Sequence, residues 1–221
     1  MKNVMKELNI FDKFEFKFLS FELDSNNTSI KTELTIAEKL AQKYHMPIEK
    51  AKKTIEYINK LGKEEGIDLK MDTCLGGNTF KAHRLVKYVE SKGKYEDTDK
   101  MIHILYDAYF TKNLLLSDDQ VLIKLGMENG LTKEEIENLL NNDDFSDEVR
   151  EDEEKGYLKG VHGVPYFIIN GTEIINGAVS KEEMKETLLK VLNKTKESNK
   201  SSHPDGIICN ENGCYIKKNK Q

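Results

Sequence analysis

The sequence predicts an α/β fold in which a small β-sheet is interrupted by a long, all-helical insertion. Two observations carry this prediction. A hairpin signal lies late in the chain, where Gly163-Val164-Pro165 leads into the apolar run 166–169 and Asn170-Gly171 reverses the direction. Between residues 31 and 159, in contrast, almost every segment has the spacing of a helix rather than of a strand. At 221 residues the chain is long enough to bury a core for such a fold.

The first strand is predicted over residues 14–21. Phe14, Phe16 and Phe18 alternate with Glu15 and Lys17, which is the period of two expected for a strand with one apolar face. A polar stretch, residues 24–28, ends this strand.

The helical block is predicted from apolar stripes and from helix start signals. Stripes over residues 37–44 and 51–61 predict two helices, and Pro47 stands where the second begins. Further helices are predicted over residues 79–91, 98–112 and 147–158, and the acidic run 147–154 is interpreted as a solvated face. Three capping boxes mark helix starts at Ser117 with Gln120, Thr132 with Glu135, and Ser180 with Glu183.

The hairpin is the most specific local signal. Asn-Gly favours a type I′ turn because both residues tolerate positive φ. Pro165 has no N–H to donate, so it belongs at the first residue of a strand or on an edge, and an X-Pro bond is the one place where a cis peptide costs little.

Composition excludes several classes of protein. Hydrophobic residues make up 38% and charged residues 33%, with a formal net charge of -5, which argues against nucleic acid as a partner. No apolar run approaches the roughly 20 residues that span a bilayer, and residues 1–8 contain no secretory signal. Three cysteines do not make a disulfide framework, so we expect a cytoplasmic protein. We expect no cofactor. We also expect no metal, because the candidate zinc ligands Cys209, Cys214 and His203 number only three and do not have a known zinc-site spacing.

Four blocks in order carry a family resemblance: residues 18–24, residues 78–85, residues 145–150, and Gly163-Val164-Pro165. Together they resemble the DsbA family of thiol–disulfide oxidoreductases, in its FrnE-like branch, within the thioredoxin superfamily. The resemblance implies a thioredoxin-like domain over residues 1–30 and 160–197, a helical insertion over 31–159, and a flexible tail over 198–221 that carries Cys209 and Cys214. It also implies a cis-proline loop and protein or peptide thiol and disulfide substrates.

The sequence departs from this family at its beginning. Members begin with a strand and a Cys-x-x-Cys motif, whereas residues 1–8 here resemble the back half of the helix that follows the motif. We therefore expect a chain truncated before the catalytic dithiol, either because the recorded start is too late or because the protein is shorter. The lost strand would leave an unpaired sheet edge, which favours the first explanation. A homodimer that covers this edge is a further expectation.

The candidate site residues follow from the resemblance. Val164 and Pro165 would form the ledge that binds an extended substrate, with His162 and Asn78 near it. Cys209 and Cys214 would form a secondary redox pair, against the alternative of an idle pair in the tail. Cys74 and His83 are interpreted as structural. Two other functions stay open, a redox-inactive peptide-binding module and a glutathione-dependent isomerase or transferase of the same superfamily.

Overall fold

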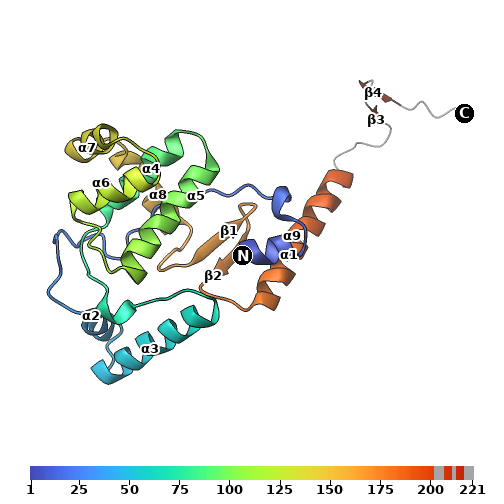
Figure 1. Cartoon of the computed structure of the whole chain (residues 1–221). Helices are drawn as coiled ribbons and strands as arrows, with labels where there is room; N and C mark the ends of the chain where they lie inside the picture. Colours follow the sequence, from blue (N-terminus) through green and yellow to red (C-terminus); the bar gives the residue numbers. More distant parts are fainter. Residues whose placement is uncertain (202–206, 211–212, 217–221) are drawn as a thin grey trace, which may run out of the picture. The chain divides into compact units, whose positions relative to one another are not determined.

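The computed structural model describes residues 1–201, 207–210 and 213–216, and from residue 196 onward it describes only the backbone. The chain divides into two compact units. The first, here called the hairpin unit, combines Met1–Phe16 with Val161–Gln221, and the second, the helical unit, is Lys17–Gly160. Figure 1 shows the elements of each unit.

The hairpin unit contains a two-stranded antiparallel sheet. Strand β1 (Tyr166–Ile169) pairs with β2 (Glu173–Asn176), with Phe167 opposite Ile175. Asn170 and Gly171 have positive φ angles of 53° and 74°, as the predicted type I′ turn requires. The predicted hairpin is therefore confirmed.

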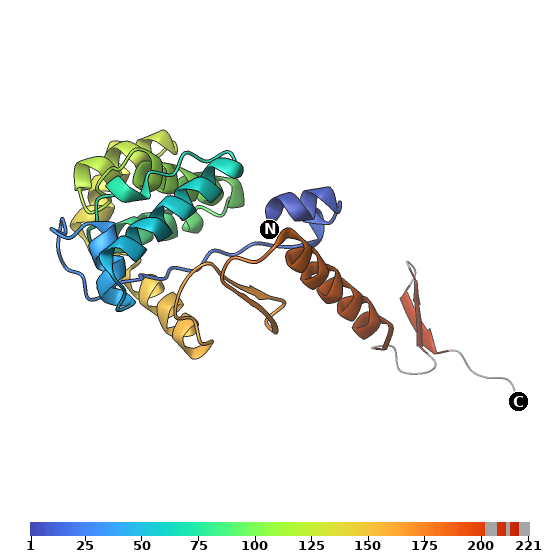
Figure 2. The same cartoon turned by 90° about the horizontal axis from the view of Figure 1, so that it is seen from below.

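Two helices pack with this hairpin. Helices α1 (Lys2–Glu7) and α9 (Lys181–Ser201) contact each other, and Figures 1 and 2 show them side by side. Their apolar residues and those of the hairpin form one cluster, in which Met5 and Leu188 are among the most completely buried. The start of α9 confirms the signal at Ser180, whose hydroxyl accepts a hydrogen bond from the Glu183 N–H at 3.1 Å.

The last part of the chain contains a second pair of strands, β3 (Ile207–Asn210) and β4 (Gly213–Ile216), which are antiparallel. Residues 198–201, placed by the sequence in the flexible tail, continue α9. The other residues of that predicted tail, 202–206, 211–212 and 217–221, lie outside the described residues.

The predicted strand over residues 14–21 is wrong. Phe11–Lys13 forms a 3-10 turn, and residues 14–22 are not part of either sheet in the described chain (blue in Figure 1). The side chains nevertheless keep the period of two, because Ser20 and Glu22 are buried whereas Leu19 and Leu23 are exposed. Alternation is a local property of the sequence, but a ladder needs a second strand, and none of the described residues supplies it.

The helical unit contains seven successive helices in the described chain. They are α2 (Ile36–Lys43), α3 (Ile48–Glu64), α4 (Phe80–Ser91), α5 (Tyr95–Tyr106), α6 (Asp119–Glu128), α7 (Lys133–Asn141) and α8 (Ser146–Leu158). A π-helical turn, Asp107–Thr111, extends α5.

The predicted helix starts are partly correct. The capping box of Thr132 and Glu135 is present at the start of α7. The box predicted at Ser117 is wrong, because Asp118 caps α6 by accepting from the Gln120 N–H at 2.8 Å. Pro47 is the N-cap of α3 rather than its first residue.

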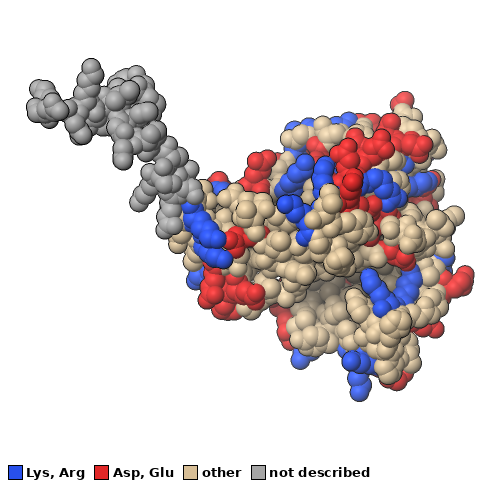
Figure 3. Space-filling view, turned by 180° about the vertical axis from the view of Figure 1, so that it is seen from behind, with Lys and Arg blue, Asp and Glu red and all other residues tan. Residues whose placement is uncertain are grey.

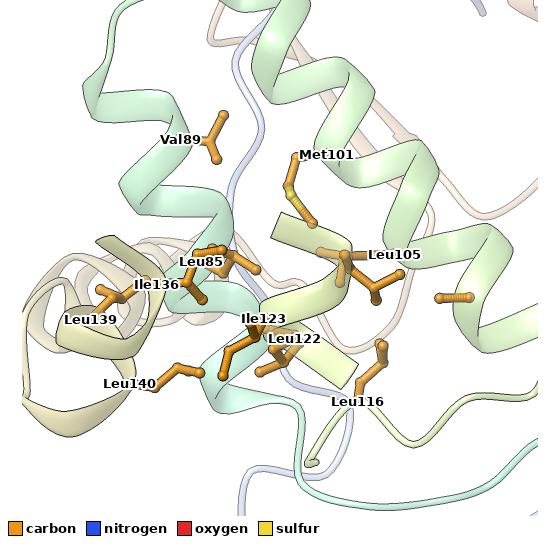
Figure 4. Packing of buried hydrophobic residues seen from close by; sticks show 13 residues of the cluster. Leu85, Val89, Met101, Leu105, Leu116, Leu122, Ile123, Ile136, Leu139 and Leu140 are labelled. Carbon is orange, nitrogen blue, oxygen red and sulfur yellow. The ribbon is translucent and has the colours of Figure 1, made fainter. Parts of the chain in front are cut away.

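The core of the helical unit is built around α4, α5, α6 and α7. Leu85 on α4, Leu122 on α6 and Ile136 on α7 are fully buried, and Figure 4 shows them with their neighbours Met101 and Leu105 on α5. Charged side chains of both signs are intermixed on the surface drawn in Figure 3. No helix in the described part of the chain is long and apolar enough to cross a membrane.

Candidate functional site

The candidate site of the hairpin unit is the loop between α8 and β1. Helix α8 ends at Leu158, and Gly160 has a φ of 77°, which glycine adopts without a steric penalty. The side chain of Val161, the next residue, is buried. The peptide bond between Val164 and Pro165 is cis.

This loop leaves the backbone groups of one residue, Val164, open to a ligand. The carbonyl oxygen of Pro165 accepts a hydrogen bond from the Gly177 N–H at 2.8 Å, which fixes the bend against β2. The Val164 side chain is 53% exposed, and the Val164 N–H and C=O make no hydrogen bond with any described residue. An extended peptide can pair with such free backbone groups. His162, two residues before Val164, is exposed on the same loop.

Asn78 belongs to the helical unit, and its side chain is already engaged. Its amide nitrogen donates to the carbonyl oxygen of Asn27 at 2.7 Å, and its amide oxygen accepts from the Phe80 N–H at 3.0 Å. These bonds tie the loop around Asn27 to the start of α4. The structure therefore shows a structural task for Asn78, and its predicted contact with substrate stays a prediction.

Cys74 is buried between a loop and the π-helical turn. Its thiol donates to the carbonyl oxygens of Tyr109 at 3.2 Å and Lys70 at 3.4 Å. Burial, followed by the charge of Asp72, raises the pKa of Cys74 to about 11. Because the thiolate is the nucleophile in disulfide exchange, this cysteine is poorly suited to redox chemistry.

Cys209 and Cys214 lie opposite each other in the ladder of β3 and β4. Directly opposed residues of an antiparallel pair have Cα atoms roughly 4.5–5.5 Å apart, which falls within the range that disulfides span. The backbone register is thus compatible with the predicted pair.

A buried charged cluster in the helical unit is the feature that sequence analysis missed. Lys87 on α4 pairs with Asp152 on α8 at 2.5 Å, and Arg150 pairs with Glu22 at 2.8 Å and with Glu153 at 2.6 Å. Asp152 and Glu153 are both 5% exposed, so the interpretation of residues 147–154 as a solvated face is wrong for these two. Their spacing from the buried Val149 and Gly156 is the signal that would have placed them inside.

His83 and Glu22 are two titratable groups that this burial perturbs. Burial lowers the pKa of His83 to about 4, so the imidazole is neutral near pH 7. Burial raises the pKa of Glu22, against the opposing effect of the Arg150 hydrogen bond. Oxygen Oε1 of Glu22 is buried without a hydrogen-bond partner in the described chain.

A cavity of about 530 Å³ also lies in the helical unit, near the start of α4 and α6. Its Lys81 forms an ion pair with Asp119 at 2.7 Å. Its Arg84 donates to the carbonyl oxygens of Asp144, Asn142 and Leu139 at 2.6–2.7 Å. Both cationic groups are therefore engaged by the protein itself. No cluster of three or more metal-ligating side chains occurs among residues with described side chains.

The predicted site residues thus fall into three places. His162, Val164 and Pro165 share one loop of the hairpin unit, Asn78 lies in the helical unit, and Cys209 faces Cys214 on the second pair of strands.

Comparison with known proteins agrees with this architecture. In the solved structures, the chain is similar to a probable DsbA oxidoreductase from Streptomyces coelicolor, with a TM-score of 0.81 and 24% sequence identity over 98% of this chain and 91% of that one. No match is found among curated proteins. The family model of the DSBA-like thioredoxin domain matches residues 1–189. The chain therefore belongs to the family of DSBA-like thioredoxin domains.

Proposed function

We propose that this protein carries out thiol–disulfide exchange with protein or peptide substrates, as a member of the FrnE-like branch of its family. The observation that carries the proposal is the bend at Val164-Pro165, where the Gly177 N–H holds the Pro165 carbonyl and the Val164 backbone groups make no hydrogen bond with any described residue. Membership in the DSBA-like family supports the same chemistry. The predicted cytoplasmic location and homodimer stay predictions.

The substrate would bind to Val164 in an extended conformation. An N–H and a C=O on the same residue can exchange two hydrogen bonds with one residue of a peptide, as in strand addition. The exposed position of Val164 leaves room for this pairing. Recognition would then depend on the peptide backbone rather than on particular side chains.

Cys209 and Cys214 would supply the redox pair within this chain. In their reduced state, one thiolate attacks a substrate disulfide, a new S–S bond forms, and the substrate's other sulfur leaves as a thiolate. The second cysteine then attacks the mixed disulfide. The substrate is released with two thiols, and Cys209 and Cys214 are left as a disulfide. Their opposed positions in the ladder support this pairing.

Reduction of insulin by dithiothreitol, followed by turbidity, tests the proposal on the full chain. We expect catalysis above the uncatalysed rate, with loss in both Cys209→Ser and Cys214→Ser. Cys74→Ala is the matched control and should keep the activity, because the Cys74 thiol is buried and hydrogen-bonded. An equal rate in the wild type and in Cys209→Ser would show that this pair does not carry the reaction.

A redox-inactive peptide-binding module is the second candidate. It is favoured by the inert environment of Cys74, the one cysteine whose side chain the structure describes, and by the fact that the Val164 ledge needs no thiol. Reduced and unfolded insulin chains would then bind without turnover, and Val164→Pro, which removes the N–H, would weaken that binding while Val164→Ile would not. Glutathione binding in the same assay would instead point to the glutathione-dependent branch.

A further inference from the structure

The segment Lys17–Glu22, here called the extended edge, is held to the helical unit along one of its two sides, and a turn follows it at Leu23. The Ser20 N–H donates to Asp152 at 3.0 Å, and the Glu22 N–H donates to Glu153 at 3.1 Å. On the same side, Lys87 donates to the Phe18 carbonyl at 3.4 Å. Side chains of α4 and α8 thus occupy the positions that a neighbouring strand would otherwise fill.

The opposite side of the extended edge has no such partners. In an extended chain the N–H and C=O groups of successive residues point alternately to the two sides. Since Ser20 and Glu22 face α8, the backbone groups of Leu19 and Phe21 face away from it. Neither Leu19 nor Phe21 makes a backbone hydrogen bond with any described residue. A row of unpaired groups at this spacing is a template for another strand.

Exposed apolar side chains accompany this open side. Leu19 is 46% and Leu23 is 54% exposed. Between them, the ring of Phe21 lies 5.2 Å from the ring of Tyr157 at the end of α8, and the next residue, Leu158, is 79% exposed. These neighbouring groups form an apolar patch of the kind that marks an interaction surface.

The charge beside the patch selects the partner. Helix α8 exposes Asp147, Glu148, Glu151 and Glu154, and Asp24 is exposed next to the segment. The exposed cations nearby are Lys17, Lys155 and Lys159, while Arg150 is engaged by Glu22 and Glu153. Carboxylates therefore outnumber cations around the patch. The chain as a whole carries a net charge of -5. A second copy would bring like charges together, whereas a basic partner is attracted over about one Debye length.

We propose that the extended edge is a docking site for a peptide with an apolar, β-prone centre flanked by lysine or arginine. The peptide adds as a β-strand along Leu19 and Phe21, and its apolar side chains cover Leu23 and Tyr157. This interaction is separate from thiol chemistry and needs no cysteine.

The test is fluorescence anisotropy with the full chain and a labelled peptide, Lys-Lys-Val-Ile-Val-Thr-Val-Lys-Lys. Leu19→Pro removes the outward N–H but leaves the inward N–H groups of Ser20 and Glu22. We expect it to weaken binding by about tenfold or more, since it removes a hydrogen bond and blocks the ladder. Leu19→Thr keeps the N–H and is the matched control, with binding close to wild type. Circular dichroism and urea midpoints verify that both variants are folded.

Two peptide variants sharpen the result. N-methylation of every second residue gives two peptides, one methylated at the odd and one at the even positions. One of them should lose binding and the other should keep it, because only one side of the added strand pairs with the extended edge. Glutamate in place of the lysines should weaken binding, and salt should weaken binding of the basic peptide. The proposal is overturned if no binding is detected at peptide concentrations up to about 1 mM. It is equally overturned by binding that Leu19→Pro leaves intact, or by self-association that Leu19→Pro abolishes in a chain that binds no peptide.

Discussion

Lys87 and Asp152 form an ion pair inside the helical unit, with 2.5 Å between Nζ and Oδ2 and only 6% of each side chain exposed. Lys87 also contacts Glu90 at 2.7 Å, so its charge is shared by two carboxylates. Burial alone would lower the pKa of Lys87, but the hydrogen bonds to Asp152 and Glu90 raise it overall. The same Asp152 accepts the Ser20 N–H, so this pair links α4, α8 and the extended edge.

Replacing one member of this pair should be strongly destabilising. Lys87→Met keeps most of the side-chain volume but leaves Asp152 buried beside Glu153 without its cation. We expect a loss of about 3–5 kcal/mol in the free energy of unfolding, measured by urea denaturation at pH 7. In the double variant Lys87→Met/Asp152→Leu, the buried carboxylate is removed together with its cation, so part of that loss should be recovered. The rest persists, because Glu90 loses its cation and the Ser20 N–H loses its acceptor. A double variant less stable than Lys87→Met alone would contradict this explanation.

Acid should destabilise the protein through His83. Its folded pKa of about 4 lies below the unfolded value near 6.5, so the unfolded chain binds the proton first. Stability is therefore fully present above about pH 6.5 and falls as the pH drops toward 4, by on the order of 3 kcal/mol. Glu22, whose pKa is raised, acts in the opposite direction below neutral pH.

Urea midpoints at pH 7, 5.5 and 4.5 measure this loss. His83→Gln cannot titrate in this range, so its midpoint should change less between pH 7 and 4.5 than that of the wild type. Parallel pH profiles for the two proteins would show that His83 is not the responsible group.

Gly77 should not tolerate a side chain. A Cβ at this position would collide with the Ile30 carbonyl oxygen, which is backbone, and with Ser117 Oγ, which itself hydrogen-bonds to that carbonyl. We expect Gly77→Ala to cost about 1–3 kcal/mol in unfolding free energy. Gly163→Ala is the matched control, because nothing lies within 4 Å of the Cβ it would add. Equal stability of the two variants would mean that the loop at Ile30 moves freely.

Cys74 should be unreactive while the protein is folded. With a pKa of about 11, it is almost entirely a thiol at pH 8, and its sulfur is buried. Native Cys74 in a Cys209→Ser/Cys214→Ser background should react with iodoacetamide at least about a hundredfold more slowly than in urea. Mass spectrometry of the labelled chain gives the rate of alkylation of Cys74. Alkylation of the native protein as fast as in urea would contradict this expectation.

The sequence predicted correctly those turns and helix starts that depend on residues close together in the chain. The Asn170-Gly171 turn and the start at Thr132 depend on residues within four positions of each other, and both are present. The strand over residues 14–21 depended on a distant partner, which alternation cannot reveal. Asp118, and not Ser117, is the N-cap of α6. Both residue types are favoured at the N-cap, and the backbone angles decide which of the two takes that position.

The candidate site was predictable to a similar degree. The loop at Val164-Pro165 has a local signature, and its geometry follows from it. The burial of Asp152 and Glu153 could not be predicted from a local signature. A carboxylate is buried only when it is paired with a cation, and the partners here, Lys87 and Arg150, lie on another helix or another turn.

Arg84 joins the end of α7 to the start of α8 by donating to three backbone carbonyls. Burial lowers the pKa of Arg84, yet a guanidinium is so strong a base that it keeps its charge at any ordinary pH. The neighbouring contacts of the extended edge are made instead by the carboxylates of Asp152 and Glu153. The two parts of the helical unit can therefore be loosened separately, since changes at these carboxylates release the segment around Ser20 and leave the contacts of Arg84 in place.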